Sequence, residues 1–281
     1  MAKASSFLFF LLISLNAFAF QYNLTICAIF QNEAIWMTEW IEFHEKQGVE
    51  HFYLYNNLSG DHYKEVLQPY VDKGLVTLIE WPKTSSSING FNHVQTTAYL
   101  HCLKNIESEA KWCAILDIDE FLFSVDGRPF AKALNDYDKF QGVAINWVCY
   151  GSSGVQKIPE GKRLIDTLLM RAPIDHVNNR FVKCVVKPEY VISCDSPHYC
   201  LLKPSAFCVN ENGENHGSKM RSKKVSVSKL RINHYWTRDL DFFYNVKIDR
   251  WITWGMPYTA AIQKESEMNA EFDDILSKLS F

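Results

Sequence analysis

Apolar and polar positions alternate in blocks along the first half of the chain. Short apolar runs at residues 24–30, 51–55, 75–80 and 112–116 predict four strands, the first of them buried on both faces. Helical patterns lie between them at 34–47, 61–71 and 92–106, with Gly48 as a stop for the first and Asp61 as a cap for the second. This β-α-β-α-β-α-β order predicts an α/β fold with a mostly parallel central sheet flanked by helices.

The second half has a less regular pattern. Residues 142–150, 181–186 and 190–192 predict strands, residues 203–224 a polar loop, and residues 237–251 a helix rich in Phe and Tyr. No internal repeat and no linker is visible in the sequence. We therefore expect residues 21–281 to form a single domain, in which ligands bind beyond the carboxyl ends of the strands.

The N-terminus predicts a targeting segment. Lys3 is followed by an uncharged apolar run at residues 7–15 and then by Ala17-Phe18-Ala19. A basic start, an apolar centre and an A-x-A site are typical of a secretory signal peptide. An uncleaved anchor is the alternative, although the run is shorter than the ~20 residues of a spanning helix. Residues 1–20 thus indicate a chain that is secreted, in the lumen of the secretory pathway, or membrane-associated through its N-terminus.

Charge and cysteine content narrow the class of protein further. The net charge is −3, so we expect no nucleic-acid partner. Eight cysteines suit an exported chain, and four of them fall close together, at Cys184, Cys194, Cys200 and Cys208. Their spacing contains no C-x-x-C pair, which argues against a zinc site. The sequence does not choose among the possible disulfide pairings.

The strongest chemical signal is a group of acids in the apolar run at residues 112–123. Asp117, Asp119 and Glu120 interrupt it, and burying such charge is costly without a cation. In an extended chain, Asp117 and Asp119 lie on one face. Two hard oxygen ligands suit Mg²⁺ or Mn²⁺, which bridge carboxylates and substrate phosphates. The alternative is a solvated acidic turn, but a position after the fourth strand of an α/β pattern favours a metal site.

Several motifs occur in the order found in one known family. Residues 117–121 (D-I-D-E-F), 39–44 (E-W-I-E-F-H), 48–55 (G-V-E-H-F-Y-L-Y) and 57–61 (N-L-S-G-D) carry the likeness in the first half. Gly151-Ser152-Ser153-Gly154, Lys183, His198 and His234-Tyr235 continue it. Together they resemble glycosyltransferase family 92 and related family-2-like enzymes. One departure is Asn56, where the family usually has Asp.

The resemblance implies a GT-A fold, a Mn²⁺ or Mg²⁺ cofactor and a nucleotide-sugar donor, namely a uridine diphosphate (UDP) sugar. It places Asp117, Asp119 and His234 at the metal, although a histidine bonded to the backbone is the alternative for His234. Lys247 faces the diphosphate or is a solvated helix residue. The expected donor-binding residues are Asn32, Glu33, Asn56, Asn57, Gln95, His101, Asp117 and Lys247.

The same resemblance implies an inverting transfer to a glycan or another hydroxyl acceptor. Inversion needs a carboxylate base, for which Glu120, Asp175 and Asp195 are the candidates. Two alternatives remain. One is a metal-dependent nucleotidyl- or phosphotransferase, although the sequence lacks a Gly-rich phosphate loop. The other is a non-catalytic secreted carbohydrate-binding protein of the same fold.

Overall fold

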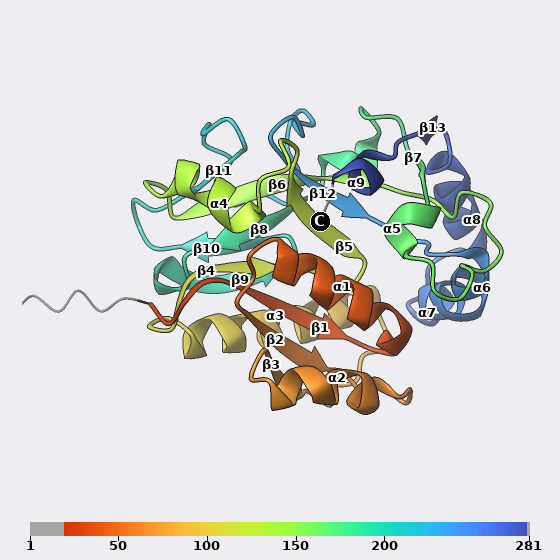
Figure 1. The fold of residues 1–281 in the computed structure, drawn as a ribbon, viewed down its shortest axis with the longest axis horizontal. Helices are drawn as coiled ribbons and strands as arrows, with labels where there is room; N and C mark the ends of the chain where they lie inside the picture. The colour runs from red at the N-terminus through yellow and green to blue at the C-terminus, as the bar shows by residue number, and fades with distance from the viewer. Residues whose placement is uncertain (1–19, 280–281) are drawn as a thin grey trace, which may run out of the picture.

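A nine-stranded sheet forms the centre of the molecule (Figure 1). The computed structural model describes residues 20–279, so the predicted signal peptide or anchor at residues 1–20 lies outside them except for Phe20. Within this described part, no helix has the length and apolar character needed to cross a membrane. The elements of the first half are β1 (Tyr22–Phe30), α1 (Ala34–Lys46), β2 (His51–Asn56), α2 (Tyr63–Asp72), β3 (Val76–Glu80), α3 (Ile88–Asn105) and β4 (Ala110–Ile115).

This half confirms the predicted alternation of strands and helices. Strand β1 lies between β2 and β4, and β3 lies outside β2, all four running parallel. Helix α3 begins earlier than expected because the Ser87 hydroxyl caps it, accepting the Gly90 N–H at 3.1 Å. Asp61 caps a different helix from the one predicted. Its carboxylate accepts the Ala34 N–H at 2.8 Å and so stabilises the start of α1, not of α2.

The second half supplies the rest of the sheet and the C-terminal segment. The full strand order is β3-β2-β1-β4-β8-β6-β12-β5, with β11 beside β6. Only β8 and β5 run against the common direction, so the predicted mostly parallel sheet is confirmed. The elements are β5 (Glu120–Ser124), α4 (Phe130–Ala133), η1 (Leu134–Tyr137), β6 (Gly142–Cys149), α5 (Leu164–Thr167), β7 (Met170–Arg171), η2 (Val177–Arg180), β8 (Val182–Val186), η3 (Pro188–Tyr190), β9 (Val191–Ser196), β10 (Tyr199–Leu202), β11 (Cys208–Val209), β12 (Leu230–His234), α6 (Leu240–Phe242), η4 (Phe243–Lys247), α7 (Ile248–Thr253), α8 (Tyr258–Glu267), β13 (Glu271–Phe272) and α9 (Ile275–Lys278).

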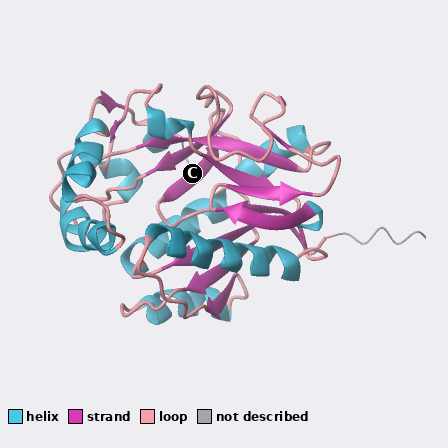
Figure 2. Ribbon diagram, turned by 180° about the vertical axis from the view of Figure 1, so that it is seen from behind, coloured by secondary structure: helices cyan, strands magenta, loops and turns pink. Residues whose placement is uncertain are grey.

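The two faces of the sheet bury separate hydrophobic cores. Along β1, Leu24, Ile26 and Ala28 pack with Trp40 of α1, whereas the alternate residues of the strand pack on the face covered by α3. Figure 2 shows α3, the longest helix, lying across the side of the sheet opposite to α1. Because both faces are covered, the strands read as continuous apolar runs.

Two features of the second half differ from expectation. Strand β5 was not predicted. It pairs antiparallel with β12 at one edge of the sheet, and α1 fastens it there through the Trp40 Nε1–H, which donates to the Glu120 carbonyl at 2.8 Å. The single helix predicted at 237–251 is instead broken. Arg238 has a left-handed φ of 62°, and residues 243–247 form a π-helical turn between α6 and α7.

Candidate active site

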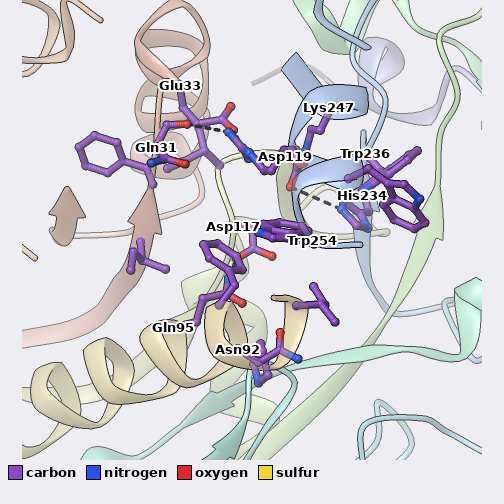
Figure 3. A pocket seen from close by; sticks show the side chains of 18 of the residues that line it. Gln31, Glu33, Asn92, Gln95, Asp117, Asp119, His234, Trp236, Lys247 and Trp254 are labelled. Atoms are coloured by element: carbon purple, nitrogen blue, oxygen red, sulfur yellow. Dashed lines mark hydrogen bonds and ion pairs between the residues drawn. The ribbon is translucent and has the colours of Figure 1, made fainter. Parts of the chain in front are cut away.

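A cleft lies where the carboxyl ends of β1, β4 and β12 meet the C-terminal segment. Its volume is about 270 Å³. Figure 3 shows Gln95 entering it from α3, Asp117 and Asp119 from the loop after β4, and His234 and Lys247 from the C-terminal side. This is the edge at which ligands bind in open α/β sheets. The lining residues of interest are Glu33, Asn57, Phe91, Gln95, Asp117, Asp119, Trp147, His198, His234, Trp236, Lys247, Arg250, Trp251, Trp254 and Lys264.

The acidic loop is a tight turn, not the extended segment that we expected. The Glu120 N–H donates to the Asp117 carbonyl at 3.1 Å, which closes the turn before β5 starts. As a result, the Asp117 and Asp119 side chains do not share one face. Each meets a different set of partners, although both line the cleft.

Asp117 contacts residues of β8 and α3. The Lys183 ammonium donates to Asp117 Oδ2 at 2.9 Å, and the Tyr99 hydroxyl to Oδ1 at 3.1 Å. Burial raises the pKa of the Asp117 carboxyl, but Lys183 outweighs that effect and the net shift is downward. The Asp117 side chain is 30% exposed to the cleft, so it is an ionised carboxylate that a ligand can reach.

Asp119 contacts the C-terminal segment instead. Its Oδ2 accepts from the Lys247 ammonium at 2.8 Å and lies 3.1 Å from Arg238 Nη1, while Oδ1 is 3.4 Å from His234 Nε2. Burial, followed by repulsion from Lys264 and Lys247, holds the pKa of His234 well below its usual range. The imidazole is therefore neutral, and Nε2 offers a lone pair when Nδ1 carries the proton.

Arg238 links the loop after β1, which contains Glu33, to the acidic turn. It is 1% exposed and donates to Glu33 Oε2 at 2.8 Å while also facing Asp119. Arg250 lies 3.6 Å from the other Glu33 oxygen. The left-handed backbone of Arg238 is uncommon for a non-glycine residue, and such strain concentrates at functional sites. Neither arginine is predicted from the sequence as a site residue. Their nearness to His234 and Lys247 in the chain was the one available signal.

The cleft is also lined by Lys264, which has no carboxylate partner among the described residues. The Lys264 ammonium lies 3.7 Å from the centre of the Trp236 ring and 5.5 Å from that of Trp251. Burial lowers its pKa to about 8. No ion pair or hydrogen bond of its ammonium is found among the described residues. Five basic side chains, Arg238, Lys247, Arg250, Lys264 and Lys183, surround the cleft, against the carboxylates of Glu33, Asp117 and Asp119 and the mainly protonated Glu120. Burial lowers the pKa of Lys247 to about 7.

Aromatic side chains form the opposing walls. Phe91 at the start of α3 stacks on Trp254 after α7, with ring centres 4.7 Å apart. The Trp147 ring packs against His234, with ring centres 4.2 Å apart. Flat aromatic faces of this kind suit the apolar faces of a base or a sugar ring. Trp254 and Phe91 also line an adjacent hollow that contains Asn32.

The structure sorts the predicted donor residues into two groups. Glu33, Asn57, Gln95, Asp117 and Lys247 line the cleft, and Asn32 lines the adjacent hollow. The Asn57 amide is held by the Trp81 and Lys83 carbonyls at 2.9 and 2.7 Å. Asn32 adopts a left-handed φ of 55° and accepts the Gly60 N–H through its side chain, so it shapes the loop.

Asn56 and His101 lie apart from the other predicted donor-binding residues, because neither lines the cleft. Asn56 is buried, and its amide donates to Glu80 Oε2 at 2.6 Å and to the Tyr63 hydroxyl at 2.8 Å. An Asp there would place a carboxylate against Glu80, which gives a physical reason for Asn in this chain. His101 is on the outer side of α3, hydrogen-bonded to the Tyr55 hydroxyl at 2.8 Å.

The three predicted base candidates also lie outside the cleft lining. Glu120 is fully buried beneath the turn, where its Oε2 accepts the Asp117 N–H at 3.0 Å. Burial raises the pKa of Glu120 to about 8, so it is mainly protonated at neutral pH. Asp175 and Asp195 are exposed on the second half of the chain, the latter hydrogen-bonded to Ser193. None of the three carboxyl groups is among the described residues that line the cleft.

The residues fit a divalent metal only in part. Among the described residues, no group of three or more His, Cys, Asp or Glu side chains is arranged to hold an ion. The Asp119 carboxylate and the neutral His234 nitrogen nevertheless face each other at 3.4 Å, and this donor pair suits Mn²⁺. A metal bound there would need further oxygen ligands from a substrate diphosphate, as Mg²⁺ and Mn²⁺ sites often do.

Comparison with known proteins decides the family. The sequence matches glycosyltransferase family 92 over residues 22–276, which is most of the chain. The chain belongs to glycosyltransferase family 92. A family 92 protein of Oryza sativa subsp. japonica is 28% identical over 173 residues, which cover 60% of this chain and 27% of that relative. A β-1,4-galactosyltransferase of Caenorhabditis elegans is 26% identical over 236 residues, covering 77% and 48%.

This family 92 chain spans between about a quarter and a half of the length of these curated relatives. Among solved structures, S. aureus TarS 1–349 in complex with UDP-GlcNAc has a TM-score of 0.39 and 13% identity, over 87% of this chain and 71% of that one. Glucosyl-3-phosphoglycerate synthase from Mycobacterium tuberculosis, solved with Mn²⁺, UDP and glucosyl-3-phosphoglycerate, has a TM-score of 0.37 and 12% identity, over 84% and 81%.

Proposed function

We propose that the cleft binds a UDP-sugar and transfers its sugar to a hydroxyl of a glycan or another acceptor. One observation carries this proposal. In the part of the chain that matches family 92, an acidic turn after β4 meets cations that outnumber the carboxylates. A surplus of buried positive charge is costly unless an anion offsets it. A nucleoside diphosphate is such an anion, and the adjoining aromatic walls suit its base and sugar.

The proposed function includes a divalent metal ion bound beside the diphosphate. When bound, Mn²⁺ or Mg²⁺ stabilises the negative charge of the departing diphosphate. Asp119 and His234 would hold it, and Asp117 would face it across the turn. Arg238 and Lys247 hold the Asp119 carboxylate in place, and Lys183 lowers the pKa of Asp117. Since the protein donors are few, metal affinity should depend on the nucleotide.

Inversion of the anomeric centre is part of this proposal. The C. elegans relative is named a β-1,4-galactosyltransferase, and forming a β-linkage from an α-linked nucleotide sugar inverts that centre. We extend inversion to this chain. Each carboxylate that lines the cleft is bound to a cation, Asp117 to Lys183, Glu33 to Arg238 and Asp119 to Lys247, but the Asp117 side chain is the most exposed at 30%. Asp117 is thus the side chain best placed to accept the proton of the acceptor hydroxyl.

The test is a panel of UDP-sugars incubated with the purified protein and Mn²⁺, beginning with UDP-galactose. We expect release of UDP from one donor, abolished by a chelator and by Asp119→Asn. Asp175→Asn, which changes an exposed acid outside the cleft, is the matched control and should keep full turnover. If no donor is turned over or bound in the presence of Mn²⁺, the proposal fails and a non-catalytic carbohydrate-binding protein becomes the better description.

The dependence of metal binding on the nucleotide can be measured without turnover. We expect Mn²⁺, followed by electron paramagnetic resonance, to bind weakly to the protein alone and at least about 10-fold more tightly with UDP present, because the diphosphate supplies the missing ligands. Equal affinity with and without UDP would contradict the assignment of Asp119 and His234 as an incomplete ligand set.

A further inference from the structure

Four cysteines gather behind one wall of the cleft. Cys184 is on β8, Cys194 on β9, Cys200 on β10 and Cys208 on β11, and all four are buried in the core that α3 covers. All are free thiols in the structure. The turn between β9 and β10 carries Pro197 and His198, which line the cleft. A disulfide between these cysteines would therefore restrain the residues that form this wall of the cleft.

Cys194 and Cys200 face each other across the β9–β10 hairpin. The two strands pair antiparallel around Tyr199 and Ser196, and the Cys194 and Cys200 Sγ atoms are 2.9 Å apart. Two sulfur atoms in simple van der Waals contact do not approach so closely. Only the turn with Pro197 and His198 lies between them, so a bond here would close the base of that turn.

Cys184 and Cys208 meet across strand β6. Cys184 pairs with Ala144 and Cys208 with Gly142, so the cysteines lie on opposite sides of β6. Gly142 leaves them room, because a Cβ at that position would lie 2.4 Å from Cys208 Sγ. The two side chains are buried in the same core, and the Cys184 thiol donates to the His198 carbonyl at 3.3 Å. Both cysteine pairs thus adjoin the His198 turn.

We propose that Cys194 with Cys200, and Cys184 with Cys208, form two disulfides that fix the Pro197–His198 wall of the cleft. A metal site is the competing reading for four cysteines, but no group of three or more ligands is arranged for an ion in the described residues. The signal segment predicted at residues 1–20 would deliver the chain to an oxidising compartment, where such bonds persist.

Each bond forms by thiol–disulfide exchange with a small-molecule disulfide such as oxidised glutathione. One cysteine thiolate attacks the oxidant, forming a mixed disulfide and releasing one thiol. The second cysteine thiolate then attacks the protein sulfur of that mixed disulfide and releases the second thiol. Two electrons pass to the oxidant, and the two cysteine protons end on the released thiols. The neighbouring thiol of Cys194 and burial raise the pKa of Cys200, and Cys184 and burial raise that of Cys208, so exchange should precede packing of the hairpin.

Disulfide mapping tests the proposal independently of the proposed function. The full chain is refolded with reduced and oxidised glutathione, alkylated without reduction, and digested with chymotrypsin, which cleaves after Tyr199 between the first pair. We expect the Cys194–Cys200 and Cys184–Cys208 links, with Cys27, Cys102, Cys113 and Cys149 alkylated. Alkylation of all eight cysteines, or a link to any of the last four, overturns the proposal.

A measurement of thermal stability tests the Cys194–Cys200 bond even if a cysteine variant folds poorly. Reduction should lower the Tm of the wild type by several degrees, because each disulfide restricts the unfolded chain. The same reduction should shift a Cys194→Ala/Cys200→Ala variant less, while Cys149→Ala, a buried cysteine of the opposite core, keeps the full shift. An equal shift in both variants would refute a bond between Cys194 and Cys200.

Discussion

The first half of the chain and the C-terminal segment contribute to the cleft in opposite ways. The first half provides carboxylates, Glu33 after β1 and Asp117 and Asp119 after β4, on a regular sheet. The C-terminal segment provides cations from an irregular stretch that contains a left-handed residue and a π-helical turn. Neither set is stable alone, since each would leave buried charge unpaired. The site is therefore a property of how the two regions dock.

The buried arginine is where that docking is most easily broken. Arg238→Met should lower the free energy of unfolding by about 3–5 kcal/mol, because Glu33 and Asp119 would lose their shared buried partner. Urea denaturation measures the loss. Arg163→Met is the control, since Arg163 forms an exposed pair with Asp166 and should cost at most about 1 kcal/mol. Equal losses would show that Arg238 does not hold the two regions together.

A substitution at Asp119 distinguishes its role in metal binding from its ion pairs with the C-terminal segment. Asp119→Asn should weaken Mn²⁺ binding in the presence of UDP about 100-fold, because it removes a carboxylate ligand. Without metal, the same change should leave UDP binding unchanged or tighter, since it frees Lys247 and Arg238. Isothermal titration calorimetry follows both. Weakened UDP binding in the absence of metal would instead indicate a purely structural role, and Asp175→Asn should alter neither affinity.

A buried histidine of the first half, His44, provides a contrast to the residues of the cleft. His44 of α1 donates from Nδ1 to the Trp40 carbonyl at 2.8 Å and accepts the Leu122 N–H at Nε2, so its role is structural. Burial lowers the pKa of His44 to about 3, against about 6.5 when unfolded.

Because the unfolded state binds the proton first, the contribution of neutral His44 is complete above about pH 6.5 and declines as the pH falls towards 3. The slope is at most about 1.4 kcal/mol per pH unit. Unfolding free energies measured between pH 7 and 5 should show a flatter slope for His44→Gln than for the wild type. Parallel slopes would mean that His44 is not buried as a neutral group.

The smallest expected effect concerns the unpaired cation. Lys264→Met should raise the Kd for UDP about 5-fold, since an exposed or half-buried charge contributes about 1 kcal/mol to an anion. Fluorescence of the neighbouring Trp236 and Trp251 provides the signal. Lys203→Met, an exposed lysine outside the cleft lining, is the control. An unchanged Kd for Lys264→Met would place the diphosphate elsewhere in the cleft.

Much of this protein follows from the sequence alone. The β/α alternation of the first half, the position of Asp117 and Asp119 beyond a buried strand, and membership of family 92 could all be predicted. Each depends on local patterns: apolar runs, helical periodicity and an acidic interruption. Local patterns suffice there because successive elements pair with their neighbours in the chain.

The partners of each acid were decided by the tertiary structure. The turn at Asp117–Asp119 sends one carboxylate to Lys183 and the other to Arg238, residues that are remote in the chain. The same packing buries Glu120 and keeps Asp175 and Asp195 outside the cleft. Long-range pairing and burial set the charge and reach of a side chain, and neither is encoded in the spacing of neighbouring residues. The sequence therefore determined which groups are present, and folding determined which of them meet.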